Sequence, residues 1–257
     1  MLIIKEVQIE RSGLLLHIII KSIYARTISI HDFRFLDLAR MLLSIGTCRK
    51  FHYSIRRNSN KSIQKMKIIF LDHDGVICLS NNWGSRSNKK KNYIRQNPEE
   101  TVQSMEDLPV IYRFDSFDSK AVILLNKILE ETGAEIVVSS DWKRHATLEE
   151  MKEYYIDQGI CKTPIAFTPN LYEFEPDTAA LFSWKNWAER ARCLEIQRWL
   201  LDNPVESWVA VDDLNMSNEY LRPGLDNFVL TARSTEGIKQ LNVSDKIKTY
   251  LNENISK

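Results

Sequence analysis

The sequence has few cysteines, and none of them forms a metal-binding pattern. Cys48, Cys78, Cys161 and Cys193 are scattered along the 257 residues, without a CxxC pair or the spacing of zinc ligands. This distribution argues against a zinc site. It favours reduced thiols in a cytoplasmic protein, because disulfides are rare in the cytosol.

The sequence also lacks a hydrophobic run long enough to cross a membrane. The longest apolar run near the start, residues 14–20, is interrupted by His17. It falls far short of the roughly 20 residues that a membrane-spanning helix needs. No small-residue cleavage site follows it, so we do not expect a secretory signal. The sequence therefore predicts no membrane partner, and no obligate protein partner is evident from it.

Acidic residues are scarce in the first quarter of the chain. Residues 1–65 hold 12 Lys and Arg against 4 Asp and Glu, whereas the remaining residues hold 23 against 30. We interpret residues 1–65 as a basic N-terminal extension that folds poorly or packs loosely. The alternative is organellar targeting, because arginines on an apolar background resemble a presequence. We favour the extension, and with it a cytoplasmic location.

From Met66 onward the pattern is typical of one α/β domain, residues 66–257. Short apolar runs predict strands at 67–72, 135–140, 207–213 and 227–231, with a further short strand at 163–169. Apolar residues at helical spacing between them predict helices at 120–133, 148–159 and 193–204. This alternation predicts a doubly wound, Rossmann-like parallel sheet with helices on both faces.

A polar segment follows the first predicted strand. Residues 81–109 are charged and are predicted to be loop, within a small cap insert at about 81–115. An insert of this size forms at most a small flap. If the insert at 145–190 is also modest, we expect an open site suited to large or exposed substrates. Cations lie here among Trp83 and Tyr93, a mixture that suits single-stranded nucleic acid, although a solvated loop is the favoured interpretation.

Polar residues end three of the predicted strands, at the sheet edge where open parallel sheets bind ligands. They come in pairs: Asp72 with Asp74, Ser139 with Ser140, and Asp212 with Asp213. Clustered carboxylates repel one another unless a cation lies among them, and hard oxygen ligands suit Mg²⁺. Such a site can bind a phosphoryl group. One carboxylate can then attack phosphorus while a second protonates the leaving oxygen.

These segments resemble a known family, the haloacid dehalogenase-like (HAD) phosphohydrolases. FLDHDGV is similar to the family's first motif, IVVSS to its second and VAVDD to its acidic fourth. RCLEIQRWL offers Arg192 for the basic third motif. Over about residues 66–240 the chain further resembles the HAD domain of multidomain RNA-repair proteins and of small stand-alone relatives.

The resemblance implies a role for each residue of the first two motifs. Asp72 is expected to be the nucleophile and a Mg²⁺ ligand. Asp74 is expected to be the general acid and base, and its backbone carbonyl would also meet the metal. Ser139 is expected to bind phosphate, with Ser140 as the other register. Because family members that cleave carbon–halogen or carbon–phosphorus bonds lack an acid at position 74, the resemblance implies hydrolysis or transfer of a phosphate ester.

The resemblance also assigns the remaining site residues. Arg192 would hold the phosphoryl group, with Lys185 or Arg190 as alternatives. Asp212 would bind Mg²⁺ and Asp213 would support it. Lys143, just beyond the second motif, is expected to contact substrate.

Some interpretations stay open at this point. His73 is expected to pack rather than act as a base, because strand alternation turns it away from its neighbours. Trp142 is expected to be structural at least as readily as to stack on substrate. We predict a phosphorylated substrate, with a nucleic-acid end as the leading choice. The alternatives are a phospho-receiver domain and a catalytically silent binding module.

Overall fold

The computed structural model describes residues 66–171, 186–221 and 223–253, and the statements below concern these residues. The predicted extension, residues 1–65, lies outside them, and so does Lys185. None of the described helices is both long enough and apolar enough to cross a membrane.

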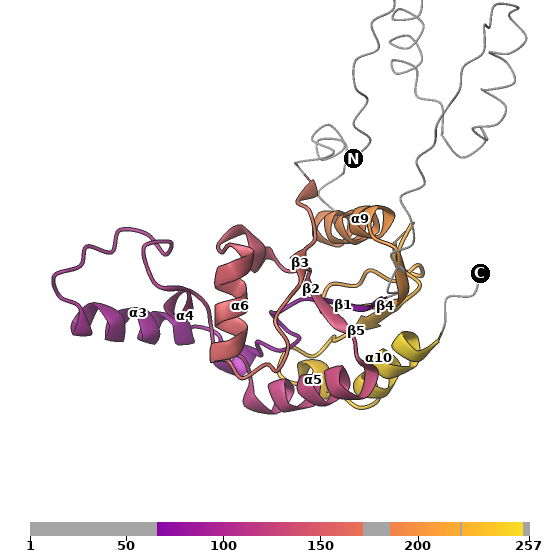
Figure 1. Ribbon diagram of the computed structural model, residues 1–257, viewed down its shortest axis with the longest axis horizontal. Helices are drawn as coiled ribbons and strands as arrows, with labels where there is room; N and C mark the ends of the chain where they lie inside the picture. Colours follow the sequence, from indigo (N-terminus) through magenta and orange to yellow (C-terminus); the bar gives the residue numbers. More distant parts are fainter. Residues whose placement is uncertain (1–65, 172–185, 222, 254–257) are drawn as a thin grey trace, which may run out of the picture. The chain divides into compact units, whose positions relative to one another are not determined.

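Five parallel strands form one sheet in the order β3-β2-β1-β4-β5 (Figure 1). The strands are β1 (Met66–Leu71), β2 (Glu135–Val138), β3 (Ala166–Phe167), β4 (Val205–Asp212) and β5 (Phe228–Leu230). The central strand β1 pairs with β2 on one side and β4 on the other. The predicted parallel sheet is confirmed. This order places the carboxyl ends of β2, β1 and β4 next to one another.

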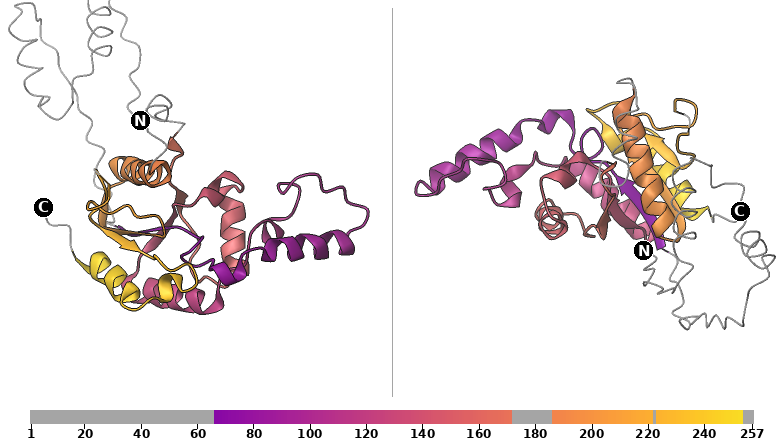
Figure 2. Two further views of the ribbon diagram at one scale, coloured as in Figure 1. Left: turned by 180° about the vertical axis from the view of Figure 1, so that it is seen from behind. Right: turned by 90° about the horizontal axis from the view of Figure 1, so that it is seen from above.

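Helices cover both faces of the sheet, as predicted (Figures 1 and 2). Helix α9 (Trp187–Asp202) lies on one face, and α5 (Ser119–Thr132) and α10 (Val243–Asn252) lie on the other. Successive side chains of β1 pack on opposite faces of the sheet, because side chains alternate along a strand. Phe70 packs edge-on against Trp199 of α9 at 5.3 Å between ring centroids. Ile69 belongs to the core cluster on the other face.

The helix boundaries differ from the prediction in one place that matters for the site. Helix α9 begins at Trp187, earlier than the predicted 193, so that Arg192 lies within the helix and not at its start. Helix α6 (Leu148–Asp157), within the predicted range 148–159, begins at a capping box formed by Thr147 and Glu150.

The prediction that residues 81–109 are loop is wrong for its first half. One short 3-10 turn, η2 (Ser80–Asn82), and two helices, α3 (Ser85–Gln96) and α4 (Val110–Arg113), follow β1. The start of α3 is capped from a distance, because Asp115 accepts a hydrogen bond from the Arg86 backbone N–H at 2.7 Å. Lys89 donates to the carbonyls of Ile111 and Phe114, each at 3.2 Å. Contacts between residues so far apart in the sequence produce no periodic apolar pattern, and for this reason the sequence does not predict α3.

Candidate active site

Three carboxylates meet at the carboxyl end of the sheet. Oxygens of Asp72, Asp212 and Asp213 lie within 4.8 Å of one another. Asp72 follows β1 and Asp212 ends β4, so the strand order itself brings them together. Gly75 allows the close approach of Asp213: its φ is +69°, and a Cβ at this position would lie 2.4 Å from Asp213 Oδ2.

Arg192 joins the carboxylates from helix α9. Its Nη1 donates to Asp72 Oδ1 at 3.0 Å and to Asp212 Oδ2 at 2.9 Å, and it also contacts the carbonyl oxygen of Ser139. Asp212 Oδ1 accepts from the backbone N–H of Leu214 at 2.8 Å. Arg190 precedes Arg192 by two positions, and residues so spaced do not share a helix face. Of the basic residues considered, Arg192 is thus the one that the described structure brings to the acids.

The cluster sets three carboxyl groups against one guanidinium. Burial raises the pKa of Asp212 well above its usual range; Asp72 raises it further, and Arg192 opposes the shift. Burial, followed by the charge of Asp72, also raises the pKa of Asp213 to about 6. One guanidinium therefore does not neutralise the group. The donor set of short carboxylates with hard oxygens fits Mg²⁺.

Two serine hydroxyls lie unused beside this cluster. Ser139 and Ser140 follow β2, each is 1 % exposed, and neither hydroxyl has a hydrogen-bond partner in the described structure. The Thr231 hydroxyl, just past β5 at the same edge, is buried and equally without a partner. A buried polar group without a partner is costly, so such groups mark places where a ligand can bind. The sequence analysis did not include Thr231 among the candidate site residues, although its position after a strand could have indicated it.

Asp74 is held by a tryptophan. Trp142, on the 3-10 turn η3 (Asp141–Arg144) after β2, donates from Nε1 to Asp74 Oδ2 at 2.8 Å. Burial raises the pKa of Asp74, and the hydrogen bond from Trp142 opposes this shift. A raised pKa suits a carboxyl group that must carry a proton near neutral pH.

Lys143 lies in a different environment from the one expected of a substrate ligand. Its ammonium group is 2.5 Å from Glu195 Oε2 and also donates to Thr168 Oγ1 at 2.9 Å and to the Pro169 carbonyl at 3.4 Å. The side chains of Lys143 and Glu195 are 2 % and 4 % exposed. The structure therefore brings Lys143 to Glu195 of α9, and its predicted contact with substrate stays a prediction.

His73 packs in an aromatic cluster, which confirms its expected role. It is fully buried, its Nε2 shares a hydrogen bond with the Tyr155 hydroxyl at 2.7 Å, and its ring lies 5.3 Å from that of Phe117. Burial, followed by the charge of Arg192, lowers the pKa of His73 to about 3. The folded protein therefore keeps this imidazole neutral.

We expect His73 to make stability depend on pH. Its folded pKa lies below its unfolded value of about 6.5, so its contribution is complete above that pH and is lost as pH falls toward 3. Between pH 7 and pH 5 the loss is about 2 kcal/mol. Urea unfolding at both pH values should show this loss in Tyr155→Phe but not in the double variant His73→Phe/Tyr155→Phe. Equal pH dependence in the two variants would contradict the expectation.

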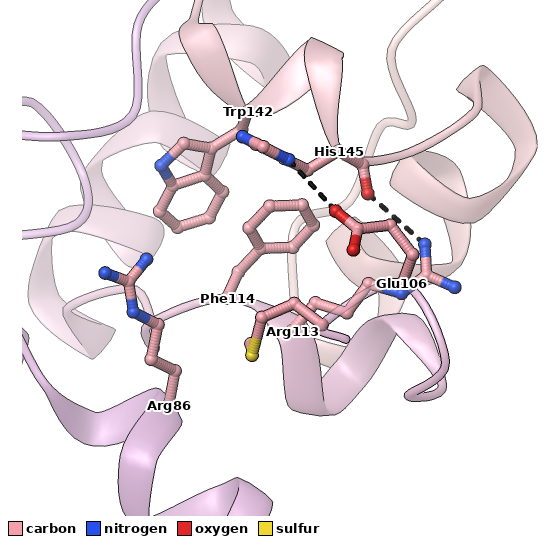
Figure 3. A pocket seen from close by; sticks show the side chains of 7 residues that line it. Arg86, Glu106, Arg113, Phe114, Trp142 and His145 are labelled. Atoms are coloured by element: carbon pink, nitrogen blue, oxygen red, sulfur yellow. Dashed lines mark hydrogen bonds and ion pairs between the residues drawn. The ribbon is translucent and has the colours of Figure 1, made fainter. Parts of the chain in front are cut away.

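A cavity of about 190 Å³ lies beside Trp142 (Figure 3). It is lined by Arg86, Met105, Glu106, Arg113, Phe114, Trp142 and His145. His145 Nδ1 lies 3.3 Å from Glu106 Oε1, and Arg113 Nη1 donates a hydrogen bond to the His145 carbonyl oxygen at 3.2 Å. Residues 172–185 lie outside the described residues, and the open site stays a prediction.

The comparisons with known proteins agree with this geometry. No curated protein and no solved structure matches the sequence significantly. The family described as "HAD domain in Swiss Army Knife RNA repair proteins" matches residues 68–243, a stretch that begins within β1, extends past β5 and holds every site residue named above. The chain therefore belongs to this family of HAD domains.

Proposed function

We propose that this protein is a Mg²⁺-dependent phosphomonoester hydrolase that acts through an aspartyl-phosphate on Asp72. Membership of a HAD family supports phosphohydrolase-type activity in general. The observation that carries the specific proposal is the joining of Asp72 and Asp212 by one buried guanidinium, next to the unpartnered hydroxyl of Ser139.

The residues divide the chemistry into two steps. In the first, a carboxylate oxygen of Asp72 forms a bond to phosphorus as the bond to the leaving oxygen breaks, and Asp74 gives its proton to that oxygen. In the second, Asp74 takes a proton from water as the water oxygen bonds to phosphorus, which frees phosphate and restores Asp72. Arg192 and the hydroxyl of Ser139 or Ser140 hold the phosphoryl oxygens in both steps.

A divalent metal fits the same acids. Asp72, Asp212 and Asp213 would hold it, with the backbone carbonyl of Asp74 as a further ligand. When bound, Mg²⁺ neutralises charge on the phosphoryl group.

A phosphate at a nucleic-acid end is the proposed substrate. The matching family is described from RNA-repair proteins, and an acid at position 74 suits the protonation of a sugar oxygen. This choice rests on the family and on Asp74, because fold alone does not determine substrate.

A substrate panel tests the proposal. We expect the wild-type protein with Mg²⁺ to release many equivalents of phosphate from a 3′- or 5′-phosphorylated oligonucleotide, and to lose this activity in excess chelator. The activity should return when Mg²⁺ is restored. Retention of one phosphate per chain would instead indicate a receiver domain. Absence of release from every ester, with Mg²⁺ present, would indicate a binding module.

A further inference from the structure

Trp142 connects the second motif to the expected general acid. It comes three residues after Ser139 and lies on η3, so one short segment supplies both the hydroxyls at the end of β2 and the donor to Asp74. Its indole N–H bonds to one defined atom, Oδ2, at 2.8 Å. Among the described residues, the thiol of Cys78 is a further side-chain donor to this carboxyl group, and a much weaker one.

The indole ring is fixed by its neighbours. It stacks on Phe114 with centroids 4.6 Å apart and planes 6° apart, and on Phe117 at 5.6 Å and 17°. The His73 ring is 4.6 Å away, and Trp142 as a whole is 7 % exposed. Because the ring cannot turn without disturbing these contacts, the direction of its N–H bond is set by the fold and not by the substrate.

A fixed N–H donor has a consequence for the chemistry of Asp74. An oxygen that accepts a hydrogen bond from an indole cannot direct a proton of its own along the same line, since indole nitrogen only donates. The carbonyl oxygen of a protonated carboxyl group accepts a hydrogen bond better than its hydroxyl oxygen does. The bond from Trp142 to Oδ2 therefore favours the proton on Oδ1.

We propose that Trp142 is a positioning residue for the general acid: its N–H fixes the rotamer of Asp74 and reserves Oδ1 for transfer of the proton to the leaving oxygen. The inference rests on the proposed function and adds to it a residue outside the four motifs quoted in the sequence analysis. It assigns Trp142 no contact with substrate.

The test depends on how much the leaving group needs a proton. An alkyl phosphate expels a strongly basic oxygen and needs the acid, whereas p-nitrophenyl phosphate expels a weakly basic one and needs it far less. General acid catalysis contributes about 100- to 10,000-fold, so partial loss of its positioning should cost about 10- to 100-fold. For Trp142→Phe we expect kcat on glycerol phosphate to fall by this factor, while kcat on p-nitrophenyl phosphate falls much less.

The matched control is Trp199→Phe, a buried tryptophan on the opposite face of the sheet, packed against Phe70. We expect it to change both rates by the same small factor. Replacement of Trp142 by 3-benzothienylalanine, which keeps the ring shape and removes only the N–H, should reproduce the selective loss even if Trp142→Phe folds poorly. Independently of activity, the indole N–H resonance missing from Trp142→Phe should shift in Asp74→Asn.

The outcomes are distinguishable. Suppose that the wild type is active and that the Trp142 variants lose activity by the same factor on both esters, or keep full activity on both. Either result would overturn the inference and leave the proposed function standing. A wild type that releases no phosphate from either ester or from the phosphorylated oligonucleotide would overturn the proposed function, and the inference with it.

Discussion

Asp72→Asn is expected to lose at least about 1,000-fold in phosphate release while remaining folded, because it removes the nucleophile and one carboxylate of the proposed Mg²⁺ site. An asparagine keeps a carbonyl oxygen that can accept the hydrogen bond that Asp72 Oδ1 now accepts from Arg192. It also removes one negative charge next to Asp212, whose pKa is raised by burial and by Asp72. In chelator, therefore, the variant should unfold at the same temperature as the wild type or higher.

The loss should be specific to the covalent step. Acid quenching of the wild type during turnover should trap phosphate on the protein in a form that hydroxylamine removes, and the variant should trap none. Asp141→Asn is the matched control, since Asp141 also lies near Arg192, at 3.8 Å, but its side chain is 70 % exposed. It should retain activity within a few-fold. Equal phosphate release by Asp72→Asn and wild type would remove the assigned nucleophile.

The sheet and its acidic edge could be predicted because each depends on a short-range pattern. β-Branched apolar runs predict buried strands, and parallel strands place their carboxyl ends at one edge. Asp72 and Asp212 are therefore neighbours in any sheet that sets β1 beside β4, as this one does. The sequence contains this information locally, in the two residues that follow each run.

The contacts that complete the site are not local. Trp142 and Asp74 lie 68 positions apart, and Lys143 and Glu195 lie 52 apart. No period in the sequence relates residues at such separations. The sequence therefore left Trp142 open between a structural role and stacking on substrate, and it placed Lys143 only as a substrate contact. Helix α10 was missed for a different reason: Val243, Ile247 and Leu251 have helical spacing, but the segment carries no strong cap.

Glu195→Gln is expected to destabilise the protein by about 3–5 kcal/mol, because it leaves the Lys143 ammonium buried without its counter-ion. Glu195 links three elements: it faces Lys143 of η3, accepts from the Leu171 backbone N–H at 2.9 Å, and lies one turn from Arg192 on α9. The pair therefore ties α9 to the segments that follow β2 and β3. Urea unfolding should show the loss, and the double variant Lys143→Met/Glu195→Leu should recover much of it.

The surface pair Arg198–Asp202 on the same helix provides the control. Its side chains are 47 % and 57 % exposed, so Arg198→Ala should cost less than about 1 kcal/mol. Lys143→Met then separates the two roles that this lysine has been given. If Lys143 is structural, the variant should lose much of its stability, and its activity on short and on long substrates should fall by the same factor. If Lys143 binds substrate, stability should be nearly unchanged and KM should rise, and this result would support the predicted contact of Lys143 with substrate.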